Sequence, residues 1–422
     1  MDTCDVVIVG AGPAGLMAAC GAARRGLATR LVERNPEPGV KILMSGGGHC
    51  NLTHATDARG IADAFGSSGR FLRSALAALD PAALVEMMDR EGVPCRTEPG
   101  GKVLPASDRA GDVLAAVTRR LARSGATLLS GQTVVELAKS DDGFRVTTPR
   151  STIRTRHLIL TTGGQSYPGC GTTGDGYRWA AELGHTIVAP RPALVPIVVD
   201  VDWVKNLQGI TLPDVVVRVV AASEESALNV ALPRRVRPIA QRRGSLLFAH
   251  FGLSGPVALD LSRYVSEAPR GRRPMLVCDL LPEVAEEELG TLFSDAAARE
   301  GSRSVASLLG RWLPRRLAES LCRQTGLPPE HRLAELPRGD RNRLARTVKQ
   351  LTLHTTGTLG FEKAEVTAGG VALDEIDSRT MQSKQVPGLF IAGELLDLDG
   401  PIGGFNLQAA FSTGHLAGQS VD

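Results

Sequence analysis

The first 33 residues constrain the fold more than any other part of the chain. An apolar segment, 5–9, leads into the sequence GAGPAG at Gly10–Gly15, and an apolar helical pattern continues to about residue 25. A second apolar segment, 28–33, completes a strand–helix–strand unit within about 30 residues. In such a unit the glycines allow a tight turn, close approach of main chain to a pyrophosphate, and close packing of helix on strand. The opening therefore predicts a dinucleotide-binding domain of the α/β class.

An acidic residue stands where this type of domain binds the adenosine ribose. Glu33 ends the second apolar segment, 18 residues after the last glycine of the turn. A carboxylate at this point accepts hydrogen bonds from ribose hydroxyls, while the helix N-terminus faces the phosphates. We therefore predict that this part of the cofactor is bound by Gly10, Gly12, Pro13, Ala14, Gly15, Glu33 and Arg34.

The C-terminal region favours FAD over NAD as the dinucleotide. The apolar strand at 389–392 ends in Gly393-Glu394, which can bring a carboxylate to the ribityl or phosphate part of FAD. A glycine-rich sequence then opens a helix whose free N–H groups and positive dipole end could face the flavin N1/C2=O edge. The residues predicted to contact FAD here are Gly393, Glu394, Gly403, Gly404, Phe405, Asn406 and Leu407.

Two internal glycine-rich segments complete the predicted cofactor site. KILMSGGGHCNLTH spans 41–54, and TTGGQSYPGCGTTGDGY spans 161–177. Consecutive glycines are useful where main chain must pass very close to a ligand. We include in the site Lys41, Ser45, Gly46, Gly47, Gly48, Asn51, Val134, Thr162, Gly163 and Gly164.

The glycine content of the chain reports the same site. Of 47 glycines, 18 fall in five windows that together contain only 37 residues. Glycine usage elsewhere is ordinary. The windows are 10–15, 46–48, 163–176, 369–370 and 393–404. The glycine excess thus belongs to segments that are each assigned to the cofactor.

Charge and cysteine pattern exclude several other classes of protein. The net charge of +3 is small for a dedicated nucleic-acid binder, so we expect a small-molecule substrate and no nucleic-acid partner. Seven cysteines without close pairs argue against disulfide and zinc scaffolds, and we expect no metal site. Glycines and a proline interrupt the most apolar stretch, 6–23, so we expect no membrane span and a cytoplasmic location. The sequence does not specify an oligomeric state.

The character of the chain changes at about residue 190. Residues 191–349 carry 24 basic and 18 acidic residues, whereas the remainder carries 24 basic and 27 acidic. Strand-like segments at 194–199, 215–221, 227–232, 245–249 and 275–280 precede helical patterns at 282–300, 305–322 and 340–351. We predict a discontinuous FAD-binding domain, 1–189 and 353–422. An insertion of 190–352 would be β-rich over 190–280 and helical over 281–352.

The ordered motifs resemble one known family. GAGPAG is followed by SGGG-x-CN-x-T at 45–53, TGG-x-SYP at 162–168, TGDGY at 173–177, FAHFGLSGP at 248–256, TAGGV at 367–371 and GELLD…GGFNLQ from 393. This series is similar to the BaiN-like, aminoacetone-oxidase-like family of bacterial NAD(P)/FAD-dependent oxidoreductases. The resemblance implies a glutathione-reductase-like, Rossmann-type FAD domain that carries an inserted β-barrel-like domain and a small helical subdomain.

Two positions depart from that family pattern. His49 stands where family members usually have Arg or Lys, and Phe405 stands where they usually have Tyr. A fixed positive charge is thereby replaced by an imidazole, which titrates near neutral pH. The substrate of a family member therefore does not transfer directly to this chain.

Three side chains are candidates for catalysis. His49 lies inside the glycine loop and could act as acid, base or anion contact beside the flavin. Tyr167 follows the 161–164 segment and could donate a proton. His250, with Ser254, could face substrate at the domain interface. The structural alternatives are a solvent-facing loop residue for His49, packing for Tyr167 and a satisfied turn for His250; Cys50 is interpreted as a packing residue.

We predict an FAD-dependent oxidoreductase that transfers hydride at flavin N5. There is no second G-x-G-x-x-G, so NAD(P)H would enter only transiently as reductant. NAD(P)H-linked reduction of a conjugated C=C bond in a small molecule is the first expectation, and amine oxidation by dioxygen is the alternative. Two readings from other classes remain open. One is a non-catalytic FAD-binding protein, and the other is an RNA-modifying flavoprotein using Arg234, Arg235, Arg237, Arg242 and Arg243.

Overall fold

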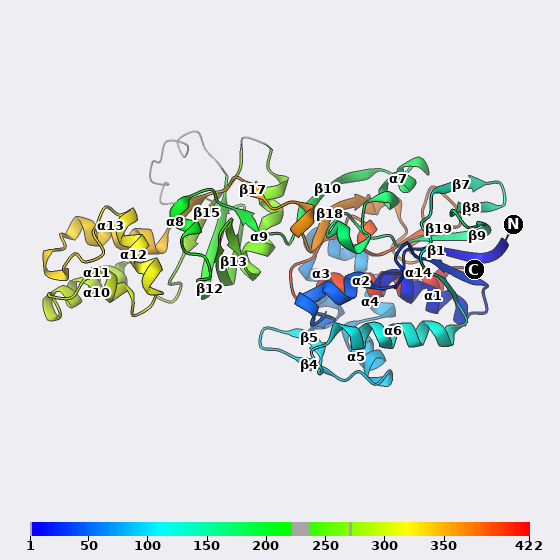
Figure 1. Cartoon of the computed structure of the whole chain (residues 1–422), viewed down its shortest axis with the longest axis horizontal. Coiled ribbons are helices and arrows are strands. Elements are labelled where there is room, and N and C mark those ends of the chain that lie inside the picture. Colours follow the sequence, from blue (N-terminus) through cyan, green and yellow to red (C-terminus); the bar gives the residue numbers. More distant parts are fainter. Residues whose placement is uncertain (1, 222–236, 270–271) are drawn as a thin grey trace. The chain divides into compact units, whose positions relative to one another are not determined.

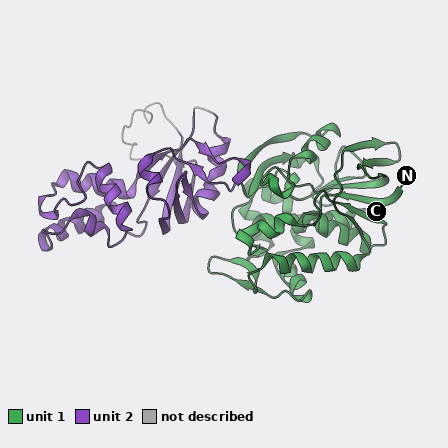
Figure 2. Cartoon of the chain, in the orientation of Figure 1, with its two compact units in different colours: residues 1–192, 364–422 green, residues 193–363 purple. Residues whose placement is uncertain are grey.

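The computed structural model describes residues 2–221, 237–269 and 272–422, and the chain forms two compact units (Figure 2). Unit 1 comprises Met1–Pro192 and Ala364–Asp422, and unit 2 comprises Ala193–Lys363. The second boundary lies later than the sequence predicted, because two strands after residue 350 pair into the sheet of unit 2. The strand expected at 227–232, with Arg234 and Arg235, lies outside the described residues.

A mainly parallel sheet forms the centre of unit 1 (Figure 1). Its order is β6-β2-β1-β9-β8-β7, with β19 also paired to β9. The bounds are β1 (Asp2–Val9), β2 (Thr29–Val32), β6 (Thr127–Leu129), β7 (Glu136–Ser140), β8 (Gly143–Thr147), β9 (Thr152–Leu160) and β19 (Leu389–Ile391). The apolar runs of β1 and β9 are fully buried at their carboxyl ends, as expected for strands covered on both faces.

Strand β9 changes partner along its length. Its first half pairs antiparallel with β8, and its last three residues pair in parallel with β19. On its other side β9 runs parallel to β1. Because β2, β1, β9 and β19 are parallel, their carboxyl ends meet at one edge of the sheet. That edge is where open α/β sheets bind ligands.

Helices and two smaller sheets surround this sheet. The N-terminal helix α1 (Pro13–Arg24) and the C-terminal helix α14 (Phe405–Ser420) pack side by side (Figure 1). The other helices are α2 (Val40–Met44), α3 (Ala58–Ala64), α4 (Arg73–Ala78), α5 (Pro81–Arg90), α6 (Ala110–Ser124) and α7 (Asp175–Glu182). The smaller sheets contain β3 (Thr53–His54), β4 (Cys95–Thr97) and β5 (Lys102–Pro105), and β10 (Ile187–Ala193) with β18 (Val366–Val371).

Unit 2 is one antiparallel sheet followed by helices. Its order is β16-β15-β12-β13-β14-β11-β17. The strands are β11 (Ile197–Val198), β12 (Thr211–Val220), β13 (Ala240–Ala249), β14 (Gly252–Ser254), β15 (Met275–Asp279), β16 (Leu351–His354) and β17 (Gly357–Thr358). The helices are α8 (Asp202–Lys205), α9 (Pro256–Glu267), α10 (Glu286–Arg299), α11 (Val305–Leu309), α12 (Arg315–Gln324) and α13 (Arg338–Lys349).

The two parts of unit 2 share one hydrophobic core. Phe248 of the sheet and Phe293 of α10 are both fully buried in the same cluster of side chains. The breaks between the helices follow the prolines, since α12 begins directly after Pro314 and α13 directly after Pro337. A search of the described residues finds no helix with the length and apolar character needed to cross a bilayer.

Glycines set the close packing of α1 on α14, and this predicts a large effect of a small substitution. A Cβ at Gly414 would lie 2.1 Å from the carbonyl oxygen of Ala14. We expect Gly414→Ala to lower the free energy of unfolding by at least about 1–3 kcal/mol, the usual cost of overpacking a core. Thermal melting followed by circular dichroism measures this loss.

A matched control is available in a second helix. A Cβ at Gly290 of α10 would meet nothing within 4 Å. Gly290→Ala should therefore raise stability by about 0.5–1 kcal/mol, because alanine loses less backbone entropy in a helix. Equal melting temperatures for Gly414→Ala and the wild-type protein would contradict the packing described here.

Candidate functional site

The turn after β1 has the geometry needed to approach a phosphate. Gly10 has φ of 99° and donates its N–H to the Val32 carbonyl at 2.8 Å. A Cβ at Gly15 would lie 1.8 Å from the Gly10 carbonyl oxygen, so this glycine is required for helix–turn packing. A Cβ at Gly12, the N-cap of α1, would instead meet nothing within 4 Å. The open space before the helix N-terminus fits a pyrophosphate.

The carboxylate of Glu33 is fixed against this turn. Its Oε2 accepts the Ala11 N–H at 2.7 Å and its Oε1 accepts the Asn35 N–H at 2.8 Å. Each carboxylate oxygen has a second lone pair, so a ribose hydroxyl can still donate to it. The neighbouring Arg34 donates to Thr173 Oγ1 at 2.7 Å and pairs with Asp175, which ties it to the loop before α7.

The end of β9 meets the end of β1. Thr161 Oγ1 donates to the carbonyl oxygens of Val9 and Gly10, at 2.9 and 2.8 Å. The next residue, Thr162, has a buried Oγ1 with no hydrogen-bond partner among the described residues. A buried hydroxyl without a partner is uncommon in a folded protein. A Cβ at Gly176 would lie 2.0 Å from this oxygen, so the hydroxyl packs against the first turn of α7.

A partly buried ion pair joins segments that are far apart in sequence. Lys41 Nζ lies 2.6 Å from Glu394 Oε2 and 2.7 Å from Ser166 Oγ. Glu394 Oε1 accepts from Ser166 Oγ at 2.9 Å and from the Thr367 N–H at 2.8 Å. A Cβ at Gly164 would lie 2.3 Å from Thr367 Oγ1. The structure thus brings together three predicted cofactor residues, Lys41, Gly164 and Glu394.

The glycine loop after α2 is held in left-handed conformation. Gly46, Gly47 and Gly48 have φ of 58°, 67° and 94°. Ser45 Oγ donates to the Ile42 carbonyl at 2.7 Å, and the Asn51 side chain lies against Gly46. A Cβ at Gly47 would meet nothing within 4 Å, so main chain is accessible there.

The two residues after the loop glycines differ sharply in exposure. The His49 side chain is 56% exposed, and its Nδ1 lies 3.1 Å from the Asp108 carbonyl oxygen. Cys50 is fully buried, and burial raises the pKa of its thiol to about 11. Cys50 is therefore a neutral thiol at physiological pH, whereas the His49 side chain is open to solvent.

The start of α14 is also a close main-chain contact. Gly404, its N-cap, has φ of 99°, and a Cβ there would lie 2.2 Å from the Thr53 carbonyl oxygen. Phe405 stacks on His54 with ring centroids 4.5 Å apart, and His54 Nδ1 lies 3.1 Å from the Gly403 carbonyl oxygen. The Asn406 amide binds the main chain at 400–401, and Leu407 is partly buried.

The remaining predicted residues lie apart from these contacts. Val134 is buried in the loop before β7. Tyr167 has φ of 55° and precedes a short 3-10 turn. His250 belongs to unit 2, where its ring contacts Phe251 edge-on at 4.9 Å. Within the described residues, no group of three or more His, Cys, Asp or Glu is placed to hold a metal ion.

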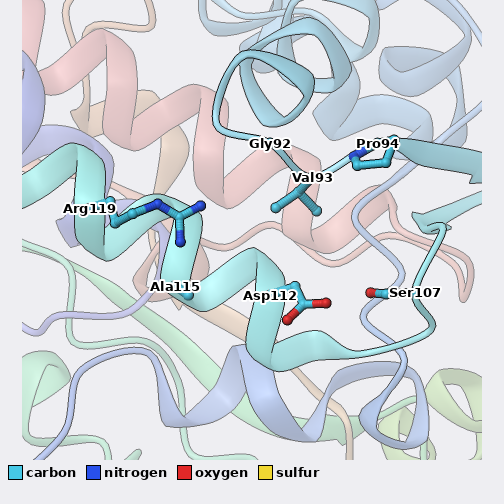
Figure 3. A pocket seen from close by; sticks show the side chains of 7 residues that line it. All are labelled: Gly92, Val93, Pro94, Ser107, Asp112, Ala115 and Arg119. Carbon is cyan, nitrogen blue, oxygen red and sulfur yellow. The ribbon is translucent and has the colours of Figure 1, made fainter.

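A surface hollow of about 330 Å³ lies elsewhere on unit 1 (Figure 3). Asp112 and Arg119 of α6 and Val93 of the facing loop project toward it. None of the predicted cofactor residues lines it. The hollow is therefore separate from the candidate cofactor site.

Comparison with known proteins identifies the fold and the cofactor class. Residues 4–420 match the family described as HI0933-like protein Rossmann domain. The chain belongs to this family. The ribosomal RNA dihydrouridine synthase of Escherichia coli K12 is 31% identical over 424 residues, covering 100% of this chain and 98% of the relative.

Two further relatives match at similar identity. The Haemophilus influenzae Rd protein with the same name is 30% identical, and a 3-dehydro-bile acid delta(4,6)-reductase of Clostridium scindens is 29% identical. Both alignments cover 98% of this chain and 98% of the relative. This HI0933-like chain is an FAD-dependent oxidoreductase with a Rossmann-type domain, as its motifs predicted.

Sequence reasoning missed three residues of the HI0933-like site. Ser166 and Thr367 hold Glu394, and His54 stacks on Phe405. All three lie in motifs that the sequence had already indicated as parts of the site, so membership of those motifs could have identified them as site residues. Their partners are 27–351 positions distant, and only the tertiary structure reveals such contacts.

Two glycines in one turn give a prediction with an internal control. We expect Gly12→Val to fold, because a Cβ there meets no protein atom within 4 Å, but to lose FAD by filling the pyrophosphate space. Gly15→Ala should instead fail to fold stably, since its Cβ would overlap the Gly10 carbonyl oxygen. Flavin absorbance per protein and thermal melting separate these outcomes. Full flavin content in Gly12→Val would contradict the placement of the cofactor.

Proposed function

We propose that this chain reduces a carbon–carbon double bond conjugated to a carbonyl, and that its substrate is a uracil base in RNA. Two relatives that align over essentially the whole chain are named ribosomal RNA dihydrouridine synthases, and this observation carries the proposal. The small net charge had disfavoured nucleic acid as a partner, and the relatives now outweigh that argument.

The names of the relatives point to one reaction class. Dihydrouridine differs from uridine by saturation of the C5–C6 bond, which is conjugated to the C4 carbonyl. A delta(4,6)-reductase of a 3-oxo bile acid also saturates double bonds conjugated to a carbonyl. Both reactions add a hydride to the carbon remote from the carbonyl and a proton to the adjacent carbon. A conjugated C=C bond is therefore favoured over an amine.

The site residues suit the first half of this chemistry. When bound, FAD would supply the hydride from N5, with NAD(P)H as the source of the electrons. The Gly10–Gly15 turn supplies the main-chain donors that would hold the cofactor, whereas Lys41 and Ser166 donate to Glu394. The first N–H groups of α14 have no intrahelical acceptor and favour negative charge near the helix start.

In this proposal His49 supplies the proton. Its Nδ1 faces the Asp108 carbonyl oxygen, so Nε2 is the atom directed away from that contact. The side chain is more than half exposed, so its proton can be replenished from water. His49→Gln should retain FAD and its reduction by NAD(P)H but lower substrate reduction by about 100-fold, a usual contribution of general acid catalysis.

The function is tested by following the flavin and the RNA together. Protein reduced anaerobically with NADPH or NADH is mixed with rRNA from cells that lack this gene. We expect the visible flavin band to return and dihydrouridine to appear in nuclease digests analysed by mass spectrometry. Gly12→Val serves as the control without flavin.

Two results would redirect the proposal. Flavin reoxidation by a 3-oxo-4-ene steroid, without any by RNA, would retain the reaction class and replace the substrate. Reduction of the flavin by an amine, with reoxidation only by dioxygen, would contradict the reductase assignment.

A further inference from the structure

The helical part of unit 2 carries a compact cluster of arginines. Arg311 binds both carboxylate oxygens of Glu300, at 2.6 and 2.5 Å, and Arg303 binds Glu300 Oε2 at 2.6 Å. These hydrogen bonds, that of Arg311 foremost, lower the pKa of Glu300 and keep it ionised. Two guanidinium groups therefore share one carboxylate, and positive charge remains in excess.

A third arginine joins the cluster from another segment. Ser304 and Arg332 form an antiparallel bridge, and the Leu333 N–H donates to the Arg303 carbonyl at 2.9 Å. These contacts place the main chain of Arg332 opposite that of Ser304 and next to that of Arg303. Arg332 is exposed and makes no ion pair among the described residues. We define the arginine cluster as Arg303, Arg311 and Arg332. It carries three positive charges, and Glu300 contributes a single negative charge.

An exposed tryptophan follows the cluster directly. Trp312 is 36% exposed, whereas Trp179 is 2% exposed. Its neighbour Leu313 is 3% exposed and anchors the segment in the core of unit 2. At 36% relative exposure, part of the Trp312 side chain remains at the surface of unit 2. An aromatic ring in this position is available to a partner.

We propose that Trp312 and this arginine cluster form a docking surface for single-stranded RNA, with phosphates on the guanidinium groups and a base on the indole. The inference rests on the proposed function for its partner and adds a surface outside the flavin site. Single-stranded nucleic acid is bound by basic surfaces that carry aromatic stacking platforms. An acidic protein would also satisfy the charges; RNA is favoured because every nucleotide combines a phosphate with a base that can stack on the indole.

The next arginines extend the same charge along the chain. Arg316 donates to the main-chain carbonyls of Asn206 and Gln208, so no carboxylate neutralises it in these contacts. Arg315 pairs with Glu319 at 2.8 Å, and its side chain is 89% exposed. The seven residues of GRWLPRR, 310–316, thus present three arginines and the tryptophan.

Direct binding to the full-length flavoprotein tests the surface. Fluorescence anisotropy of a labelled single-stranded oligouridine is measured over a series of KCl concentrations. Arg332→Gln should weaken binding several-fold and reduce the slope of log K against log salt by about one, as loss of one phosphate contact does. Trp312→Ala should weaken binding by roughly fivefold or more through lost stacking.

Arg59→Gln in α3 of unit 1 is the matched control, because that side chain is 87% exposed and distant in sequence from the cluster. It should bind RNA as the wild-type chain does. Flavin content, melting temperature and flavin reoxidation by a free conjugated enone are measured for every variant. Retention of all three in Arg332→Gln and Trp312→Ala shows that neither folding nor the flavin site has changed.

The possible outcomes separate this surface from the proposed reaction. Unchanged RNA affinity in both variants would overturn the docking surface, whatever the flavin chemistry. Equal competition by polyglutamate and by oligouridine would also overturn it, because the surface would then bind polyanions without regard to bases. A third outcome is that the wild-type protein binds oligouridine, both variants bind it more weakly, and no RNA is reduced. That outcome would support the docking surface and refute the proposed function.

Discussion

The close approach of main chain at the carboxyl ends of β1, β9 and β19 determines the rest of unit 1. A Cβ at Gly10 would lie 2.7 Å from the Thr161 carbonyl oxygen, and one at Gly393 would lie 2.9 Å from the Ala14 side chain. Three strand ends can therefore share one edge only because glycine occupies these positions. The glycines of this turn also leave the N-terminus of α1 open. Close packing of the strand ends and space for the cofactor therefore have the same cause.

The polar contacts across this edge hold a discontinuous domain together. Lys41 and Glu394 are 353 residues apart, and Ser166 and Thr367 complete their hydrogen bonds. With side chains 23% and 18% exposed, the pair is partly removed from water. Such a pair is stable only when its hydrogen bonds are satisfied. The site thereby links both ends of the chain, although all of unit 2 lies between them in sequence.

The surface of unit 2 is informative where its sequence motifs are not. The FAHFGLSGP motif contributes strands β13 and β14, with His250 in the turn between them. No chemistry could be derived from that motif. The arginines of 303–332 are spread over 30 positions, and a charge total of +3 for the chain conceals their grouping. Their proximity depends on the bridge between Ser304 and Arg332, which sequence spacing does not predict.

The sequence by itself determined the strand–helix–strand opening, the FAD class and the existence of an inserted unit, because these follow from local periodicity and from glycines with one physical purpose. The tertiary structure decided the second boundary, where β16 and β17 pair with unit 2. It also decided the orphaned Thr162 hydroxyl, the partners of Glu394 and the stack of His54 on Phe405. Each of these depends on which distant segments become neighbours, and that information resides in packing and not in local pattern.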